Sequence, residues 1–105
     1  MPIKEIDELK DSLIESLLPV KIYLFGSFAE GRDTTESDFD FYIVVKDSNE
    51  DMLTLTAKAY KSIRFKQRRA VDIIVNTEHE FATRRCRKSC VEYEVSQKGV
   101  LLYGE

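Results

Sequence analysis

The chain has 105 residues, of which 43% are hydrophobic and 33% are charged, a composition typical of one folded domain rather than of a disordered chain. Its net charge of −3 argues against binding nucleic acid through overall charge, and no apolar run approaches the roughly 20 residues that span a bilayer. The stretch from Met1 to Glu5 has no apolar signal core. We therefore expect a cytoplasmic protein with a single domain over residues 1–105, and neither a membrane nor a nucleic acid as direct partner.

Apolar periodicity and turn residues predict an alternation of helices and strands. In chain order we expect a helix over 3–17, a strand over 20–26, a turn or short helix over 27–37, a strand over 38–45, a helix from the capping box at 48–51 to about 67, a strand over 70–75, a helix from the capping box at 77–80 to about 97, and a strand or extended segment over 100–103. This order predicts an α/β (α+β) fold, in which a small mixed β-sheet is flanked by helices.

Charge is distributed unevenly along the chain. The first 55 residues carry 13 acidic and 5 basic side chains, whereas the last 50 carry 6 acidic and 11 basic ones. The basic residues form two clusters: Lys61, Arg64, Lys66, Arg68 and Arg69, then Arg84, Arg85, Arg87 and Lys88. Such a division is compatible with a site for metal and nucleotide, with a dimer or with a complementary partner, and charge alone does not choose between them.

Cysteine and histidine content indicates a reducing environment and excludes a structural zinc site. Cys86 and Cys90 are too few for a disulfide framework and lack CxxC spacing, and His79 is the one histidine. On the helix predicted from 77 to 97, the two cysteines share a stripe with Ala82 and Tyr93, so we interpret them as core residues.

Two aspartates stand at the head of the second predicted strand. Asp38 and Asp40 flank Phe39 and therefore point to one face of the strand, because side chains alternate. Two carboxylates ~7 Å apart repel each other unless a cation lies between them, and a divalent cation with oxygen ligands would serve. The alternative is a solvated strand end with two exposed carboxylates.

Asp72 is the one charge in the apolar run from Ala70 to Val75. An unpaired buried carboxylate costs several kcal/mol or takes up a proton, so it needs a partner. If the third strand lies beside the second, Asp72 meets Asp38 and Asp40. The alternative is an ion pair with a neighbour such as Arg69.

The first strand leads into Gly26 and Ser27, and Gly31 follows. A strand that passes through Gly-Ser into a short helical turn exposes backbone N–H groups and a hydroxyl, which suit a phosphate. By itself this pattern is also that of an ordinary turn.

Taken together, these residues resemble the signature of the nucleotidyltransferase superfamily related to DNA polymerase beta. The pattern GSxxxG from Gly26 to Gly31, five residues, and then SDxD from Ser37 to Asp40 has the family's spacing without insertion. Asp72 is similar to the family's third aspartate. At this size the chain resembles a minimal nucleotidyltransferase.

The resemblance implies nucleotidyl transfer with two Mg²⁺ ions and ATP as substrate. Asp38, Asp40 and Asp72 would be the catalytic metal ligands, and nucleotide would bind at Gly26, Ser27 and Ser37. Minimal members resemble antitoxins that transfer AMP to a tyrosine of a HEPN-domain toxin. Two alternatives remain open: a binding module that neutralises its partner stoichiometrically, and an enzyme that modifies a small molecule, as aminoglycoside nucleotidyltransferases do. A homo-oligomer is possible.

The chain departs from the family pattern at Glu30, where relatives often carry a basic residue. A carboxylate beside the triphosphate would weaken binding through Coulomb repulsion, by an amount on the order of 1 kcal/mol at a solvated edge. From the sequence alone we expect Glu30→Lys to tighten binding of magnesium–ATP.

Overall fold

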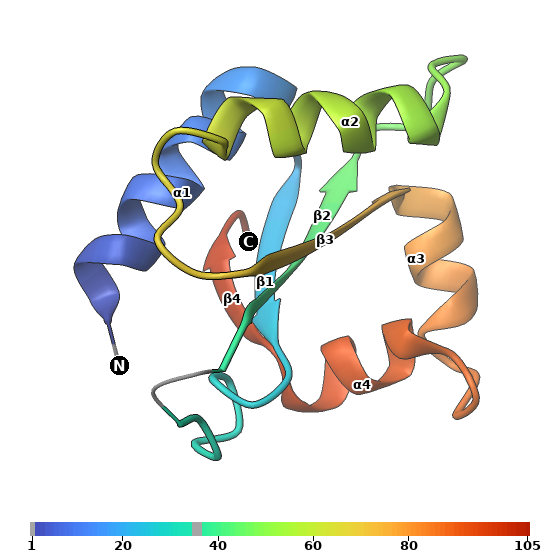
Figure 1. The fold of residues 1–105 in the computed structure, drawn as a ribbon. Coiled ribbons are helices and arrows are strands. Elements are labelled where there is room, and N and C mark those ends of the chain that lie inside the picture. The colour runs from blue at the N-terminus through green and yellow to red at the C-terminus, as the bar shows by residue number, and fades with distance from the viewer. Residues whose placement is uncertain (1, 35–36) are drawn as a thin grey trace.

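Helices and strands alternate along the chain in a computed structural model that describes residues 2–34 and 37–105 (Figure 1). The elements are α1 (Ile3–Leu17), β1 (Lys21–Phe25), β2 (Phe39–Val45), α2 (Met52–Ile63), β3 (Val71–Thr77), α3 (Glu78–Arg84), α4 (Val91–Lys98) and β4 (Val100–Tyr103). The expected mixed α/β class is confirmed. Residues 35 and 36 of the predicted 27–37 turn lie outside the described residues.

The four strands of the described chain form one mixed sheet in the order β3-β2-β1-β4. β1 runs antiparallel to β2 and β4, whereas β2 and β3 are parallel, with α2 in the crossover that a parallel pair requires. The end of β1 therefore lies beside the starts of β2 and β3, at the same end of the sheet. In this register Phe25 is opposite Asp40, and Asp40 is beside Asp72.

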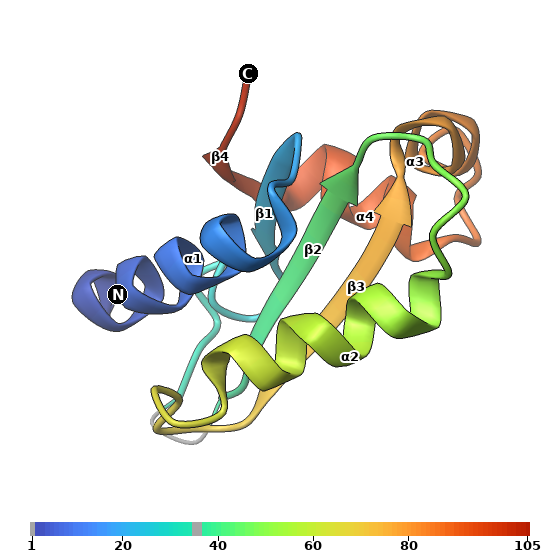
Figure 2. The same ribbon diagram turned by 90° about the horizontal axis from the view of Figure 1, so that it is seen from above.

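The sheet lies between two layers of helices (Figure 2). Side chains of α1 and α2 pack with those of alternate strand positions, including Phe39, Phe41 and Ile43, to form the larger core. α3 and α4 pack on the other face, where Tyr42 joins Phe81 and Val95 in a smaller cluster. Asp40 alternates with Phe39 and Phe41, so its side chain lies on the face that α4 covers.

The single helix expected from 77 to about 97 is wrong, because α3 ends at Arg84 and α4 begins at Val91. Thr77 does cap α3, by accepting a hydrogen bond from Glu80 N at 3.2 Å. Arg84 ends α3 and the connection carries Arg85, Arg87 and Lys88, and like charges three or four positions apart destabilise a continuous helix.

The break also changes the interpretation of the cysteines. Cys86 is exposed in the connection, and Cys90 is half-buried and precedes the first residue of α4. Neither belongs to the two buried core clusters, so their assignment to a core stripe is wrong.

α2 is shorter at both ends than expected. Asp51 rather than Ser48 is the N-cap, and its carboxylate accepts a hydrogen bond from Leu53 N at 3.1 Å. The hydroxyl of Ser48 instead accepts from Glu50 N at 3.2 Å. The helix ends at Ile63, followed by a turn. Within the described residues, no helix is both long and apolar enough to cross a membrane.

Candidate active site

Two carboxylates lie close together at the end of the sheet where β1 ends and β2 and β3 begin. Asp40 of β2 and Asp72 of β3 are neighbours in the parallel register, and the charge of Asp72 acts on the carboxyl group of Asp40. The pKa of Asp40 is raised to about 6, first by burial and then by the negative charges of Asp72 and Asp38. Asp38 and Asp72 therefore both act electrostatically on Asp40.

Asp72 itself is exposed, so the expectation that its carboxylate is buried in the core is wrong. Val71 and Ile73 point into the larger core, and alternation turns Asp72 to the opposite face. The alternative pairing with Arg69 is not formed either, because Arg69 binds Glu5. The feature that makes Asp72 a candidate site residue is its position beside Asp40 in the sheet.

Asp38 precedes β2 rather than heading it, because the strand begins at Phe39, and its side chain is exposed. Within residues 2–34 and 37–105, no three His, Cys, Asp or Glu side chains stand close enough together to hold a metal ion as positioned. Asp40 and Asp72 nevertheless present oxygen donors at a point of uncompensated negative charge, which fits a hard divalent cation such as Mg²⁺. Asp38 would complete the set only by turning toward that pair.

Gly26 lies against the carboxylate of Asp40. Its φ is +76°, and a Cβ added at this position would collide with Asp40 Oδ2. The chain then makes a helical turn, in which Glu30 N donates to Gly26 O at 3.1 Å and Arg32 N donates to Ser27 O at 2.9 Å. The first N–H groups of such a turn have no preceding carbonyl to bond, so they are suited to an anion.

Ser27 and Ser37 differ in their surroundings. Ser27 is half-buried within this turn. The hydroxyl oxygen of Ser37 accepts a hydrogen bond from Thr34 N at 2.8 Å, and Ser37 N donates to Thr34 O at 3.1 Å. Ser37 therefore closes its own loop, next to the start of β2.

Arg69 connects Ser37 to α1 through hydrogen bonds. Its Nε and Nη2 donate to the two carboxylate oxygens of Glu5 at 3.1 Å each. The guanidinium lies 4.5 Å from the ring centroid of Phe39 and 5.1 Å from that of Phe28, and Nη1 donates to Ser37 O at 3.5 Å. Arg69 thereby links α1 to the aromatic pair beneath the turn.

α4 brings a further carboxylate, Glu94, that sequence reasoning missed. The charge of Glu94 contributes to the raised pKa of Asp40. A continuous helix from 77 to 97 would not return to this part of the sheet. The position of Glu94 therefore depends on the break before Val91, for which the only sequence signal is the basic run.

A buried hydrogen bond holds α4 on the sheet. Tyr42 of β2 donates to Glu92 Oε2 at 2.6 Å, and Glu92 is only 3% exposed. Burial raises the pKa of the Tyr42 hydroxyl, and the hydrogen bond to Glu92 raises it further, so the Tyr42 hydroxyl keeps its proton and remains the donor at neutral pH.

Removing this donor should weaken the fold. We expect Tyr42→Phe to lower the free energy of unfolding by about 1–3 kcal/mol, because a buried carboxylate loses its partner. Tyr23→Phe is the matched control, since both rings contact Phe81, with centroids 5.4 and 5.3 Å away, but no described side chain accepts from the Tyr23 hydroxyl. Urea denaturation measures both variants, and equal losses would contradict the assignment.

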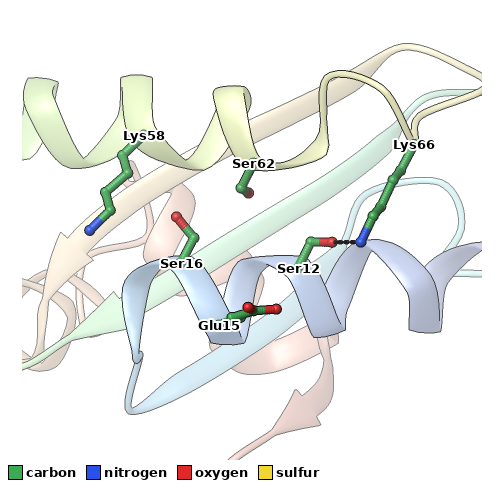
Figure 3. A pocket seen from close by; sticks show the side chains of 6 residues that line it. All are labelled: Ser12, Glu15, Ser16, Lys58, Ser62 and Lys66. Atoms are coloured by element: carbon green, nitrogen blue, oxygen red, sulfur yellow. Dashed lines mark hydrogen bonds between the residues drawn. The ribbon is translucent and has the colours of Figure 1, made fainter.

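A separate hollow lies on another part of the surface. A groove of about 430 Å³ runs between α1 and α2, and Figure 3 shows Lys66 reaching across it to Ser12, with Nζ and Oγ 2.6 Å apart. Because α1 and α2 cover the opposite face of the sheet from Asp40, this groove is separate from the carboxylate site.

Comparison with known proteins relates the fold to nucleotide transfer. The family described as nucleotidyltransferase domain matches residues 6–96. A structure from Sulfolobus solfataricus, described as a nucleotidyltransferase, aligns with a TM-score of 0.62 and 22% identity over 97% of this chain and 79% of that one. A toxin–antitoxin structure with AMP-PNP aligns with a TM-score of 0.55 and 21% identity, over 100% and 75% of the two chains.

A mutant of the toxin–antitoxin MntA-HpeT aligns with a TM-score of 0.54 and 20% identity, over 96% of this chain and 73% of that one. At these identities the three structures share the fold. No curated protein sequence matches the chain.

Proposed function

The chain belongs to the nucleotidyltransferase domain family, and from that premise we propose that its single domain transfers AMP from ATP to a hydroxyl of a partner toxin. The observation that carries the proposal is the pairing of Asp40 with Asp72 beside the glycine turn at Gly26. This arrangement offers oxygen donors for a cation next to backbone N–H groups suited to phosphates.

Each proposed role follows from position. Asp40 and Asp72, with Asp38 turned toward them, would hold two Mg²⁺ ions. Bound there, the ions supply neutralisation of the triphosphate charge and a lowered pKa for the acceptor hydroxyl. Ser27 and the N–H groups that follow Gly26 would orient the β- and γ-phosphates.

The proposed reaction is an in-line displacement. An oxygen of the acceptor forms a bond to the α-phosphorus of ATP while the bond from that phosphorus to the bridging oxygen breaks. Pyrophosphate leaves with that oxygen, and the hydroxyl proton of the acceptor passes to solvent water. The chain's part is to place the triphosphate between the turn at Gly26 and the carboxylates.

A protein acceptor is the favoured substrate. The toxin–antitoxin structures support this choice, since one of them is described with AMP-PNP and the MntA-HpeT mutant replaces two aspartates two positions apart with glutamate, the spacing of Asp38 and Asp40. We propose a HEPN-domain toxin with a tyrosine acceptor, as the sequence resemblance implies.

Radiolabelled ATP tests the proposal directly. The purified chain is incubated with Mg²⁺, ATP labelled at the α-phosphate, and the toxin encoded beside its gene. We expect label on the toxin, lost when Asp72 is changed to alanine. In a thermal melt, Mg²⁺ and ATP should stabilise the wild type more than Asp72→Ala.

Three other results would contradict the proposal. Neutralisation of the toxin without labelled product would favour stoichiometric binding. Label found only on an added aminoglycoside would favour a small-molecule substrate. Equal thermal shifts for wild type and Asp72→Ala would remove Asp72 from the site.

A further inference from the structure

Glu30 lies in the turn that follows Gly26 and is paired with two cations. Its Oε2 is 3.2 Å from Nη2 of Arg32, and its Oε1 is 3.8 Å from Nζ of Lys98 at the end of α4. The carboxylate side chain is 16% exposed, whereas those of Arg32 and Lys98 are each 63% exposed. A sheltered anion thus holds two cations whose outer parts face solvent.

The end of α4 is itself fixed to β1. Gly99 N donates to Val95 O at 2.9 Å, and a Cβ added at Gly99 would meet that carbonyl and would lie 3.4 Å from Leu24 O. Because Gly99 lies against Leu24 O and Val100 pairs with Leu24, Lys98 at the end of α4 is held near the end of β1. Its proximity to Glu30 therefore comes from the packing of the backbone as well as from the ion pair.

We infer that Lys98 and Arg32 bind the triphosphate of the nucleotide and that Glu30 is a positioning residue that holds both cations at the turn. This inference rests on the proposed function, in which the turn at Gly26 receives the phosphates. Glu94 of α4 also faces Glu30, so two carboxylates balance the two cations, and it is the exposed outer ends of Arg32 and Lys98 that remain available to an anion. A triphosphate oxygen can then be contacted by the exposed ends of both cations while Glu30 keeps their stems in place.

The inference reverses the expectation drawn from the sequence. An unpaired Glu30 would repel the triphosphate, so Glu30→Lys would tighten binding. In the structure the hydrogen bond from Arg32, together with the positive charges of Arg32 and Lys98, lowers the pKa of Glu30, so the carboxylate is ionised and compensated. A lysine at position 30 would repel Arg32 and Lys98, and we expect weaker binding.

Calorimetry with Mg²⁺–ATP and with tripolyphosphate tests the inference. We expect Lys98→Met to raise the Kd for both ligands about tenfold, as for a lost charge-assisted contact, and to flatten the dependence of Kd on salt. The kcat should change less than the KM. Lys88→Met is the matched control, since it removes an exposed lysine from the connection between α3 and α4 and should leave the Kd unchanged.

Glu30→Gln separates positioning from simple repulsion, because the two predict opposite signs. Removing a negative charge would tighten binding if Glu30 only repelled the phosphates. If Glu30 positions the cations, the Kd should rise about threefold, a change of about 0.7 kcal/mol, and Glu30→Asp should recover part of the loss. Melting temperatures of all the variants identify any that fail to fold.

The outcomes distinguish this inference from the proposed function. Transfer activity with an unchanged Kd in Lys98→Met would overturn the inference alone, as would tighter binding in Glu30→Gln. Binding of tripolyphosphate that depends on Lys98, without any transfer activity, would support the inference and count against the proposed function. A wild type that does not bind tripolyphosphate would overturn the inference.

Discussion

Replacing Asp40 with asparagine is expected to lower the rate of nucleotidyl transfer about a thousandfold, which corresponds to about 4 kcal/mol of transition-state stabilisation. The reason is that Asp40 lies at the centre of the site, beside Asp72 in the register of the sheet and against Gly26. An amide supplies one weak oxygen donor in place of a charged carboxylate. Single-turnover transfer of label to the toxin measures the loss.

The same substitution should stabilise the protein in metal-free buffer. The pKa of Asp40 is raised from 3.8 to about 6 in the folded state, so the folded state binds this proton more tightly than the unfolded chain. Stability from this proton is fully present below about pH 4 and is lost as the pH rises through about 6. Above that pH, the ionised carboxylate destabilises the wild type, and asparagine does not.

The expected gain has a definite pH profile. The difference between the two pKa values corresponds to about 3 kcal/mol, and screening at this partly exposed site reduces the gain to about 1–2 kcal/mol. The excess stability of Asp40→Asn should therefore grow between pH 4 and 6 and then level off. Urea denaturation in EDTA measures it, with Asp11→Asn on the exposed surface of α1 as control. A less stable variant at pH 7 would mean that the carboxylate is structural.

Local patterns predicted most of the fold because each was satisfied within one element. The apolar spacing from Ile6 to Leu13 predicts α1 over 3–17, which are its observed bounds. The apolar run after Asp38 predicts β2, which is buried along most of its length. In each case a single local period identifies the buried face.

The part of the candidate site that could be predicted from the sequence is the part formed by residues of neighbouring strands. Alternation along β2 and β3 brings Asp40 to Asp72 once the two strands are neighbours, and that adjacency is observed. The exposure of Asp72 was not predictable from its apolar neighbours, because only tertiary packing decides which face of a strand is covered.

The contribution of α4 was missed for a different reason. Glu92 pairs with Tyr42, which lies 50 positions earlier in the chain, and Lys98 pairs with Glu30 across an even longer separation. Both contacts exist because the chain turns back after Arg84. A helix predicted without that break directs all of these side chains elsewhere, so no local pattern could reveal their partners.

Gly26→Ala is expected to have the second large effect, on both stability and activity. The added methyl group is unfavourable for two separate reasons. A non-glycine residue at a φ of +76° costs about 1 kcal/mol or more. The added Cβ also collides with Asp40 Oδ2, and moving that carboxylate adds a further cost of about 1–2 kcal/mol. Displacement of Asp40 should lower transfer activity about a hundredfold.

Gly31→Ala isolates the backbone cost, since Gly31 has a φ of +71° but an added Cβ meets nothing within 4 Å. We expect it to lower the free energy of unfolding by about 1 kcal/mol and to keep most of the transfer activity. In an Asp40→Ala background, which removes the colliding atoms, the cost of Gly26→Ala should fall to that of Gly31→Ala. The double-mutant cycle then gives a coupling energy of about 1–2 kcal/mol between positions 26 and 40. If Gly26→Ala costs the same in both backgrounds, the glycine serves the turn alone, and close approach to the carboxylate is not the reason for its presence.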